Sequence, residues 1–438
     1  MSPVPRISGL TVKGFKSINL EKSIEIRPLT ILAGANSSGK SSFLQPLLLL
    51  KQTLEASGDP GPLQLFGNHV RFTSTDQLLS RSSSKKQCNT FCITIKLSGG
   101  ESLTNHFVKE DGKSLELNCM EYKSTNENFK IKMNMSNEDI LKIIPEPWKD
   151  YQKTIKDNEV KWTVVRDRCF LEFAMVKDEA SKHRFHYGPG ISPSTLFLPH
   201  ILSLIHLPGL RGNPQRTYSK TTGGPNFQGS FEQYVASVIA QWAVEKSAKL
   251  IKLGDNLEEL GLAWKVTAKH IDDANIELKV GRLPHSKQGG AQDLVNITDV
   301  GFGVSQSLPV VVALLVAKPG QLVYLEQPEI HLHPLAQRRL AYILRDAAKR
   351  GVITVVETHS ALLLREIQTL VTKEQISKND VKLHWFTRDE DGYTTISSSD
   401  LDEFGSYGKW PEDFDQTELD AEKEYLDAVE IKQYNHDG

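Results

Sequence analysis

The segment GANSSGKS, residues 34–41, contains the residue types that point most directly to a chemistry. It matches the pattern GxxxxGK[ST] in full, and it lies between a mostly apolar run at 29–33 and another that begins at residue 43. A loop of this kind between a strand and a helix binds phosphate, because its backbone N–H groups and the helix start converge on the anion. Lys40 is expected to reach the β- and γ-phosphate oxygens, and the Ser41 hydroxyl to ligate Mg²⁺. The predicted nucleotide-binding residues of the loop are Gly34, Ala35, Asn36, Ser37, Ser38, Gly39, Lys40, Ser41 and Ser42.

A second chemical segment, YLEQPEIHLHP at 324–334, begins within a further apolar run. A carboxylate at the end of such a buried strand can hold the metal ion of a phosphate site, so Glu326 is predicted to bind Mg²⁺ directly or through water. A second carboxylate that activates water is expected next, but the sequence has Gln327 there. A neutral amide can orient water and cannot accept its proton.

Three explanations therefore remain open for how the attacking water is activated, or whether it is activated at all. Gln327 could orient the attacking water, with slow turnover as the result. Glu329 or Glu357 could supply the missing base, or nucleotide could bind without useful hydrolysis. Slow, gated hydrolysis is the favoured account.

At this point the sequence resembles a known group of proteins. The stretch TILAGANSSGKSSFLQPLLLLKQ, from residue 30, is similar to the N-terminal half of the ATP-binding-cassette ATPases of the SMC, RecF and OLD group. The segment DVGFGVSQ at 299–306 stands where that group has its LSGGQ signature, a helix start that binds the γ-phosphate held by the opposite subunit. The resemblance implies that Gly301, Gly303 and Ser305 contact that phosphate, although Gly301 replaces the serine of the signature.

The same resemblance assigns the remaining site residues. His359, in ETHS after VITVV, matches the switch histidine that contacts the γ-phosphate. The implied ligands are ATP and Mg²⁺. The implied catalytic residues are Lys40, Glu326, Gln327 and His359, and the implied metal ligands are Ser41 and Glu326.

Two further positions stay open within the resemblance. Lys16, in VKGFKSI, is either a basic residue near the phosphates or an exposed lysine at a strand end. A glutamine that senses the γ-phosphate and the metal should follow the first helix, and the sequence does not decide among Gln52, Gln64 and Gln77.

Arginines and histidines in two loops have competing interpretations. LPGLRGNPQRTY at 207–218 is similar to a loop of OLD-like ATPases, so Arg211 and Arg216 are expected to contact phosphate or a partner, or to be solvated surface groups. His331 and His333 could face one zinc ion, but no third ligand is evident in the sequence. The resemblance favours a loop that crosses the dimer interface.

The order of the predicted elements indicates an α/β fold whose sheet is split in sequence. Strands alternate with helices near the N-terminus and again after residue 290, which is typical of a mostly parallel sheet covered on both faces. The expected organisation is a first ATPase half at 1–58, an inserted β-rich and helical lobe at 59–290, a second ATPase half at 291–400 and an acidic tail at 401–438.

The bulk composition is that of a soluble folded protein. The chain has 438 residues, a formal net charge of −2 and 24% charged residues. The near-neutral net charge does not indicate general nucleic-acid binding, although the local basic run RSSSKK at 81–86 could contact phosphate. No signal peptide or membrane span is evident, so a cytoplasmic protein without membrane contact is expected. The cysteines at 88, 92, 119 and 169 show no metal-ligand spacing and are expected to be packed thiols.

The resemblance also implies a mode of action. Two copies would hold two ATP molecules in a head-to-tail homodimer, a clamp that hydrolysis opens. OLD proteins carry a C-terminal TOPRIM nuclease and SMC proteins a long coiled coil, and this chain has room for neither. The expected function is therefore that of stand-alone ATPase subunits of anti-phage systems such as Septu and PARIS, which work with a separately encoded nuclease of HNH or TOPRIM type. A RecF- or SMC-like DNA-repair clamp is the alternative.

Overall fold

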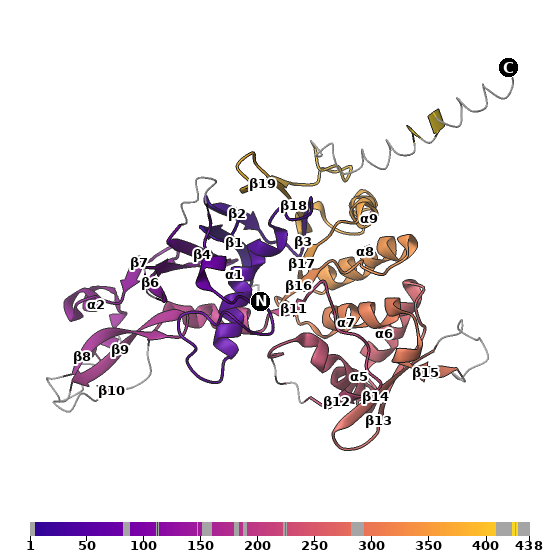
Figure 1. The fold of residues 1–438 in the computed structure, drawn as a ribbon, viewed down its shortest axis with the longest axis horizontal. Helices are drawn as coiled ribbons and strands as arrows, with labels where there is room; N and C mark the ends of the chain where they lie inside the picture. The colour runs from indigo at the N-terminus through magenta and orange to yellow at the C-terminus, as the bar shows by residue number, and fades with distance from the viewer. Residues whose placement is uncertain are drawn as a thin grey trace.

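The structure is a computed structural model, shown in Figure 1. It describes residues 5–81, 88–110, 112, 114–146, 148–150, 160–178, 184–186, 191–221, 224, 226–281, 293–408, 423–424 and 426–427. Most of the basic run at 81–86 and most of the acidic tail predicted at 401–438 lie outside the described residues. Within the described part of the chain, none of the helices is long and apolar enough to cross a bilayer.

The central element is a six-stranded sheet assembled from distant parts of the chain. Its strand order is β11-β16-β17-β3-β18-β19, and all neighbours are parallel except β18 and β19. The N-terminal strand β3 lies between two strands from the C-terminal part, so the predicted α/β class with a split, mostly parallel sheet is confirmed. The strands are β3 (Leu29–Gly34), β11 (Ile205–Leu207), β16 (Leu322–Glu326), β17 (Ile353–Glu357), β18 (Val381–Arg388) and β19 (Thr394–Ser399).

The inserted lobe is rich in antiparallel strands, as predicted. Its largest sheet has the order β2-β1-β4-β5-β6-β7, so the two first strands of the chain join the insert rather than the parallel sheet. These strands are β1 (Ile7–Lys13), β2 (Lys22–Glu25), β4 (Thr90–Leu97), β5 (Ser102–Lys109), β6 (Leu115–Lys123) and β7 (Asn128–Lys132). One smaller sheet contains β8 (Val160–Asp167), β9 (Phe170–Asp178) and β10 (Arg184–His186). Another contains β12 (Tyr218–Ser219), β13 (Val266–His270), β14 (Asn275–Gly281) and β15 (Leu294–Asn296). Strand β11, from the same insert, adds an edge to the parallel sheet.

Helices cover the parallel sheet on both faces. The helices are α1 (Lys40–Glu55), α2 (Asn137–Ile143), α4 (Leu198–Leu202), α5 (Val235–Val244), α6 (Ala248–Glu259), α7 (Phe302–Val316), α8 (Pro334–Lys349) and α9 (Ala361–Thr372). In Figure 1 the sheets of β1 to β7 (without β3) and β8 to β10 lie with α1 on the left of the parallel strands, and α5 to α9 lie with β12 to β15 on the right.

Alternation of side chains along β3 explains why the sheet has two cores. Ile31 packs in the core that contains α5 to α9, whereas Leu32 packs in the core of α1 and the antiparallel lobe. Successive residues of a strand point to opposite faces, so a strand buried on both faces must be continuously apolar. Burial of every residue of LTILAG agrees with that requirement and places the end of β3, where the phosphate loop begins, at the middle of the molecule.

Candidate functional site

The phosphate loop adopts a wrapped backbone conformation between β3 and α1. Gly34 has φ 134° and Gly39 has φ 103°, a region that residues with a Cβ rarely adopt. A Cβ on Gly34 would also overlap the carbonyl oxygen of Phe386 on β18. Glycine is therefore required at Gly34 by both conformation and space, and this explains why the pattern begins with that residue.

Lys40 lies inside the loop that it is predicted to serve. Its side chain is almost fully buried, and Nζ donates to the carbonyl oxygens of Gly34 at 3.0 Å and Ala35 at 2.8 Å. Burial lowers the pKa of Lys40, and the nearby carboxylate of Glu357 offsets part of that effect. The ammonium is thus held at the centre of the loop, where it can move to a phosphate oxygen by exchanging carbonyl partners.

Two carboxylates lie side by side next to the loop. Parallel pairing of β16 with β17 aligns Glu326 with Glu357 at the ends of the two strands. Glu357 accepts hydrogen bonds from the hydroxyls of Ser41 at 2.9 Å and Tyr324 at 3.0 Å. Burial raises the pKa of Glu357, and the negative charge of Glu326 adds to that rise. The predicted metal ligand Ser41 therefore contacts Glu357 in the structure rather than Glu326.

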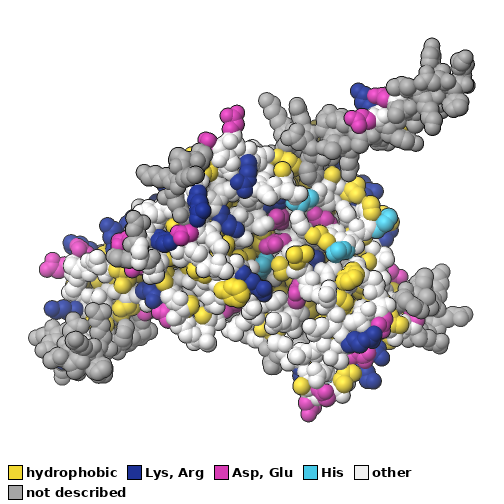
Figure 2. Space-filling view, viewed as in Figure 1, with side chains coloured by type: hydrophobic (Ala, Val, Ile, Leu, Met, Phe, Trp, Pro, Cys, Tyr) yellow, Lys and Arg dark blue, Asp and Glu magenta, His cyan; other side chains and the backbone are white. Residues whose placement is uncertain are grey.

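Glu326 is held by residues that the sequence did not bring into the site. Its Oε1 lies 3.0 Å from Nε2 of His206, and its Oε2 accepts a bond from the N–H of Gly209 at 3.3 Å. Burial favours the neutral acid, but the bond with His206 and its charge more than offset this and lower the pKa of Glu326. His206 reaches the site because β11 pairs with β16, and no local sequence signal predicts that pairing. On the face seen in Figure 2, acidic and histidine side chains gather near the middle of the molecule.

A buried chain of polar groups continues from His206 away from the phosphate loop. Nδ1 of His206 lies 3.4 Å from Nδ1 of His69, and Nε2 of His69 lies 3.2 Å from Glu55 near the end of α1. Glu55 also pairs with Lys51 at 2.6 Å. These side chains connect the far end of α1 with the carboxylate at the end of β16.

Gln327 occupies a fixed turn immediately after Glu326. Its φ is 44°, and its backbone N–H donates to the carbonyl oxygen of Glu357 at 2.7 Å. The next carboxylate, Glu329, accepts bonds from the Thr358 hydroxyl at 2.7 Å and from the backbone N–H of His359 at 2.9 Å. Of the two candidate replacement bases, Glu357 therefore faces the phosphate loop and Glu329 supports the switch-histidine turn. Burial lowers the pKa of His359, and the charge of Lys40 adds to this effect.

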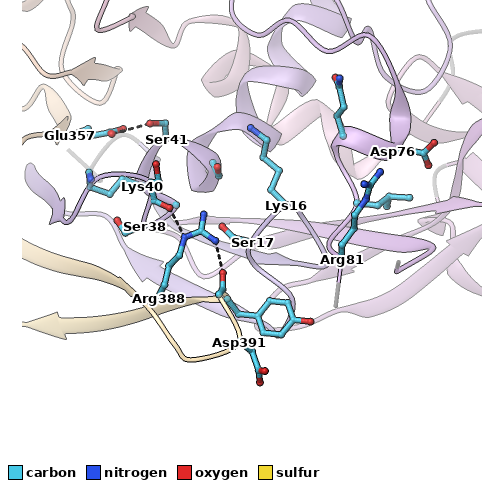
Figure 3. A pocket seen from close by; sticks show the side chains of 17 residues that line it. Lys16, Ser17, Ser38, Lys40, Ser41, Asp76, Arg81, Glu357, Arg388 and Asp391 are labelled. Carbon is cyan, nitrogen blue, oxygen red and sulfur yellow. Dashed lines mark hydrogen bonds between the residues drawn. The ribbon is translucent and has the colours of Figure 1, made fainter. Parts of the chain in front are cut away.

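A cavity of ≈ 780 Å³ opens beside the phosphate loop (Figure 3). Lys16 and Gln77 line it, whereas Gln52 and Gln64 line a different cavity. The Lys16 ammonium donates to Gln45 at 2.8 Å, and burial lowers its pKa. The structure thus places Lys16 on the nucleotide side, and Gln77 is the one of the three candidate glutamines that faces the same space.

The hairpin between β18 and β19 holds the outer side of the loop. Nε of Arg388 donates to the carbonyl oxygen of Ser37 at 2.6 Å, and the Thr394 hydroxyl donates to that of Ser38 at 2.8 Å. Figure 3 shows Arg388 beside the loop and Asp391 further out on the hairpin. No local sequence pattern indicates that this hairpin belongs to the site.

The predicted signature residues lie at the start of α7, away from the cavity at the phosphate loop. Gly301 is the N-cap, and no side chain caps the helix start. Gly301 and Gly303 line a separate cavity of ≈ 340 Å³, and the described lining of the first cavity contains no residue of 299–306. Phe302 is 56% exposed, and its ring centroid lies 6.2 Å from that of His331. The exposed helix start and the exposed loop around His331 therefore share one surface.

Arg211 and Arg216 occupy different environments. Arg211 is 8% exposed, and its guanidinium donates to the carbonyl oxygens of Gln306 at 3.2 Å and Glu326 at 3.0 Å. It thereby links the start of α7 to the end of β16. Arg216 is exposed and pairs with Asp299 at 2.8 Å. Arg211 is therefore buried and bound to backbone carbonyl groups, so it is not available to a phosphate or partner at the surface. Of the two arginines, Arg216 is the one exposed to solvent.

Comparison with known families gives two matches. Residues 6–183 match the family described as AAA ATPase domain, and residues 264–365 match the family described as AAA domain, putative AbiEii toxin, Type IV TA system. Both matches are to AAA domains. They support an ATPase, and a family of ATPases implies ATP binding. The comparison with curated proteins gives no match.

The solved structures that are similar to this chain include SMC heads. The SMC head bound to the C-winged helix domain of ScpA is 13% identical, with 91% of this chain and 98% of that chain covered and a TM-score of 0.48. The SMC head of Thermotoga maritima is 10% identical, with 90% and 98% covered and a TM-score of 0.38. The head from Pyrococcus furiosus, with an extended coiled coil and bound to the C-terminal domain of ScpA, is 12% identical, with 98% and 100% covered and a TM-score of 0.45.

The link made by Arg211 leads to a stability prediction. Arg211→Ala removes the donors of buried carbonyl groups, and we expect the free energy of unfolding to fall by about 1–3 kcal/mol. Arg216→Ala removes one exposed ion pair and should cost less than about 1 kcal/mol. Urea unfolding of both variants measures the difference. Equal losses in the two variants would show that the carbonyl contacts of Arg211 contribute nothing beyond a surface charge.

Proposed function

We propose that this protein is an ATPase that binds ATP at the phosphate loop and hydrolyses it slowly. The observation that carries the proposal is the combination of an assembled loop with Gln327 at the position of a base. Lys40 lies inside the loop, and the Ser41 hydroxyl is bonded to a carboxylate. Gln327 has no group that can accept a proton from water, so it can contribute only by orienting the water.

The residues around Ser41 fit a magnesium ion. Mg²⁺ takes hard oxygen ligands, and the Ser41 hydroxyl lies 2.9 Å from Glu357 with Glu326 aligned beside it on the next strand. A bound Mg²⁺ would offset the negative charge of the phosphate oxygens. The Ser41 hydroxyl and the two carboxylates are the groups that would hold it. Glu326 is kept ionised by His206, and Glu357 is oriented toward Ser41 by Tyr324.

The active unit is a head-to-tail homodimer. The N-terminus of α7 offers backbone N–H groups without a side-chain cap, and a helix N-terminus attracts anions. Since Gly301 and Gly303 do not line the cavity of their own phosphate loop, a second copy is the natural source of the phosphate that they would bind. The exposed Phe302 and His331 on the same surface would then lie at the interface.

The biological role is regulation of a separately encoded nuclease effector in bacterial anti-phage defence. Slow hydrolysis supports this role, because a clamp that stays closed on ATP suits the restraint of an effector better than rapid mechanical cycling does. The family description matched by residues 264–365, with its putative AbiEii toxin and Type IV TA system, also supports a defence context.

The catalytic part of the proposal predicts a gain of activity. Gln327→Glu places a carboxylate in the same turn, and we expect the ATP turnover rate to rise by about tenfold or more, since general bases contribute roughly 10²–10⁴-fold. Steady-state phosphate release measures the rate. Adding Lys40→Ala to the same variant should abolish turnover and shows that the gain arises at this site. If Gln327→Glu leaves turnover unchanged while Glu357→Gln eliminates it, Glu357 is the base and the proposed role of Gln327 is wrong.

The dimer predicts a substitution that blocks assembly without harming the fold. A Cβ at Gly301 meets no atom within 4 Å, and its φ of −62° suits any residue. Gly301→Asp adds a good N-cap and a negative charge where phosphate should bind, so the variant should fold normally and fail to dimerise with ATP and Mg²⁺. Gly301→Ser, a neutral N-cap, should still dimerise. Sedimentation velocity measures assembly, and ATP-dependent dimerisation of Gly301→Asp would contradict the sandwich.

The defence role predicts that protection requires nucleotide binding. Bacteria that carry this gene with its genomic neighbours should resist phage, and Lys40→Ala should abolish the resistance because the loop loses its phosphate contact. Plaque counts measure protection. Lys269→Ala, an exposed lysine on β13, is the matched control and should protect as well as the natural protein. Full protection by Lys40→Ala would contradict an ATP-dependent role.

A further inference from the structure

Three neighbouring strands of the largest antiparallel sheet bring together side chains that are far apart in sequence. In the register of β4, β5 and β6, Cys92 pairs with His106, and His106 pairs with Cys119. Directly paired residues of neighbouring strands point to the same face, so the two thiols flank the imidazole. Cys92 and His106 alternate with the buried residues of their strands, which places the group on the face turned away from the core.

An irregularity in the sheet lies next to this group. The pairing of β5 with β6 shifts register between His106 and Phe107, so that β6 accommodates one additional residue there. Such bulges re-aim side chains and are common beside functional sites. Beyond the bulge, Cys119 and Glu121 both lie on the face of His106, and both are at least partly buried.

The donor atoms have the spacing of a metal site. One ligand atom from each of His106, Cys119 and Glu121 lies within 4.8 Å of the others. Nε2 of His106 lies 3.2 Å from Oε1 of Glu121, and Nδ1 lies 3.0 Å from Sγ of Cys92. The imidazole therefore has one nitrogen turned to the carboxylate and the other supported by a second thiol.

The ammonium group of Lys130 lies beside the proposed ligand atoms of Glu121 and Cys119. The Lys130 ammonium lies 2.7 Å from Oε1 of Glu121, and it also interacts with Cys119. The Lys130 side chain is 43% exposed, so it can turn into solvent and leave its place to another cation. A dication that binds the thiolate, imidazole and carboxylate together would gain bonds that an ammonium cannot form.

We propose that His106, Cys119 and Glu121 form a binding site for one zinc ion, with Cys92 supporting the histidine. Sulfur, nitrogen and carboxylate oxygen are the three donor types that zinc uses in proteins. Three protein ligands leave the fourth tetrahedral position to water or to an outside donor. The site is separate from the phosphate loop and does not depend on the proposed function.

Binding requires two proton movements that the site can accommodate. The Cys119 thiol must lose its proton to solvent, because the thiolate is the metal ligand. The neutral His106 ring must carry its proton on Nδ1, from which it can donate a hydrogen bond to Sγ of Cys92. Nε2 is then free to bind the ion.

Titration of the full-length, metal-free protein with Co²⁺ and Zn²⁺ tests the proposal. Co²⁺ should give a thiolate-to-cobalt charge-transfer band at one equivalent, Zn²⁺ should displace it, and excess Mg²⁺ should not. His106→Ala and Cys119→Ser should lose the band, and Cys92→Ser should keep it with affinity about 10–100-fold weaker. Lys130→Ala removes the competing cation and should bind about tenfold more tightly. Circular dichroism confirms that each variant is folded.

The control is a thiol outside the cluster. Cys88 donates to Asn19 at 3.3 Å, and Cys88→Ser should leave the band and its affinity unchanged. The proposal is overturned if the natural protein shows no charge-transfer band, if Cys119→Ser retains it, or if Lys130→Ala binds no more tightly than the natural protein. The last result is informative even if a cysteine or histidine variant fails to fold.

Discussion

The pairing of β17 with β3 on one side and with β16 on the other determines the arrangement of the site. It aligns Glu357 with Leu32 of the strand that leads into the phosphate loop, and with Glu326 on the opposite neighbour. The carboxyl ends of parallel strands meet at one edge of a sheet, so this register alone brings loop and carboxylates together. It also places two acids next to each other in a largely buried place, where like charges and desolvation both disfavour ionisation. The two acids differ in their surroundings. The hydrogen bond with His206 helps to lower the pKa of Glu326, whereas burial raises the pKa of Glu357 despite its bonds with two hydroxyls.

This register also constrains the path of the chain. Strand β3 lies between β17 and β18, so the chain must leave its neighbourhood after α1 and return to both sides of it only with β17 and β18, in the C-terminal part. The insert uses that excursion to contribute to the site, since β11 adds His206 and the loop after it adds Gly209 and Arg211. The lobe therefore supplies direct contacts to Glu326, and a change in the lobe near β11 would be felt there.

Local patterns predicted the parts of the site whose chemistry is continuous in sequence. The phosphate loop, the strand ending at Glu326 and the turn at His359 each combine an apolar run with a fixed polar spacing, so their positions followed from the residues. Sequence alone does not distinguish Gln77, which lines the cavity at the phosphate loop, from Gln52 and Gln64, which line another. The cluster of Cys92, His106 and Cys119 depends on the register of three strands, and sequence spacing carries no information about it. The roles of His206 and Arg211 were missed for the same reason.

The backbone of the turn at Gln327 is held by contacts that do not involve its side chain. The backbone there has a positive φ and is held by the bond from the N–H of Gln327 to the carbonyl of Glu357. Neither feature involves the side-chain amide of Gln327, so a glutamate could adopt the same backbone conformation there. Arg211 and Glu329 hold the carbonyl before the turn and the switch-histidine segment in place independently of that side chain. The proposed slow hydrolysis therefore depends on the Gln327 side chain and not on a change in the backbone around it.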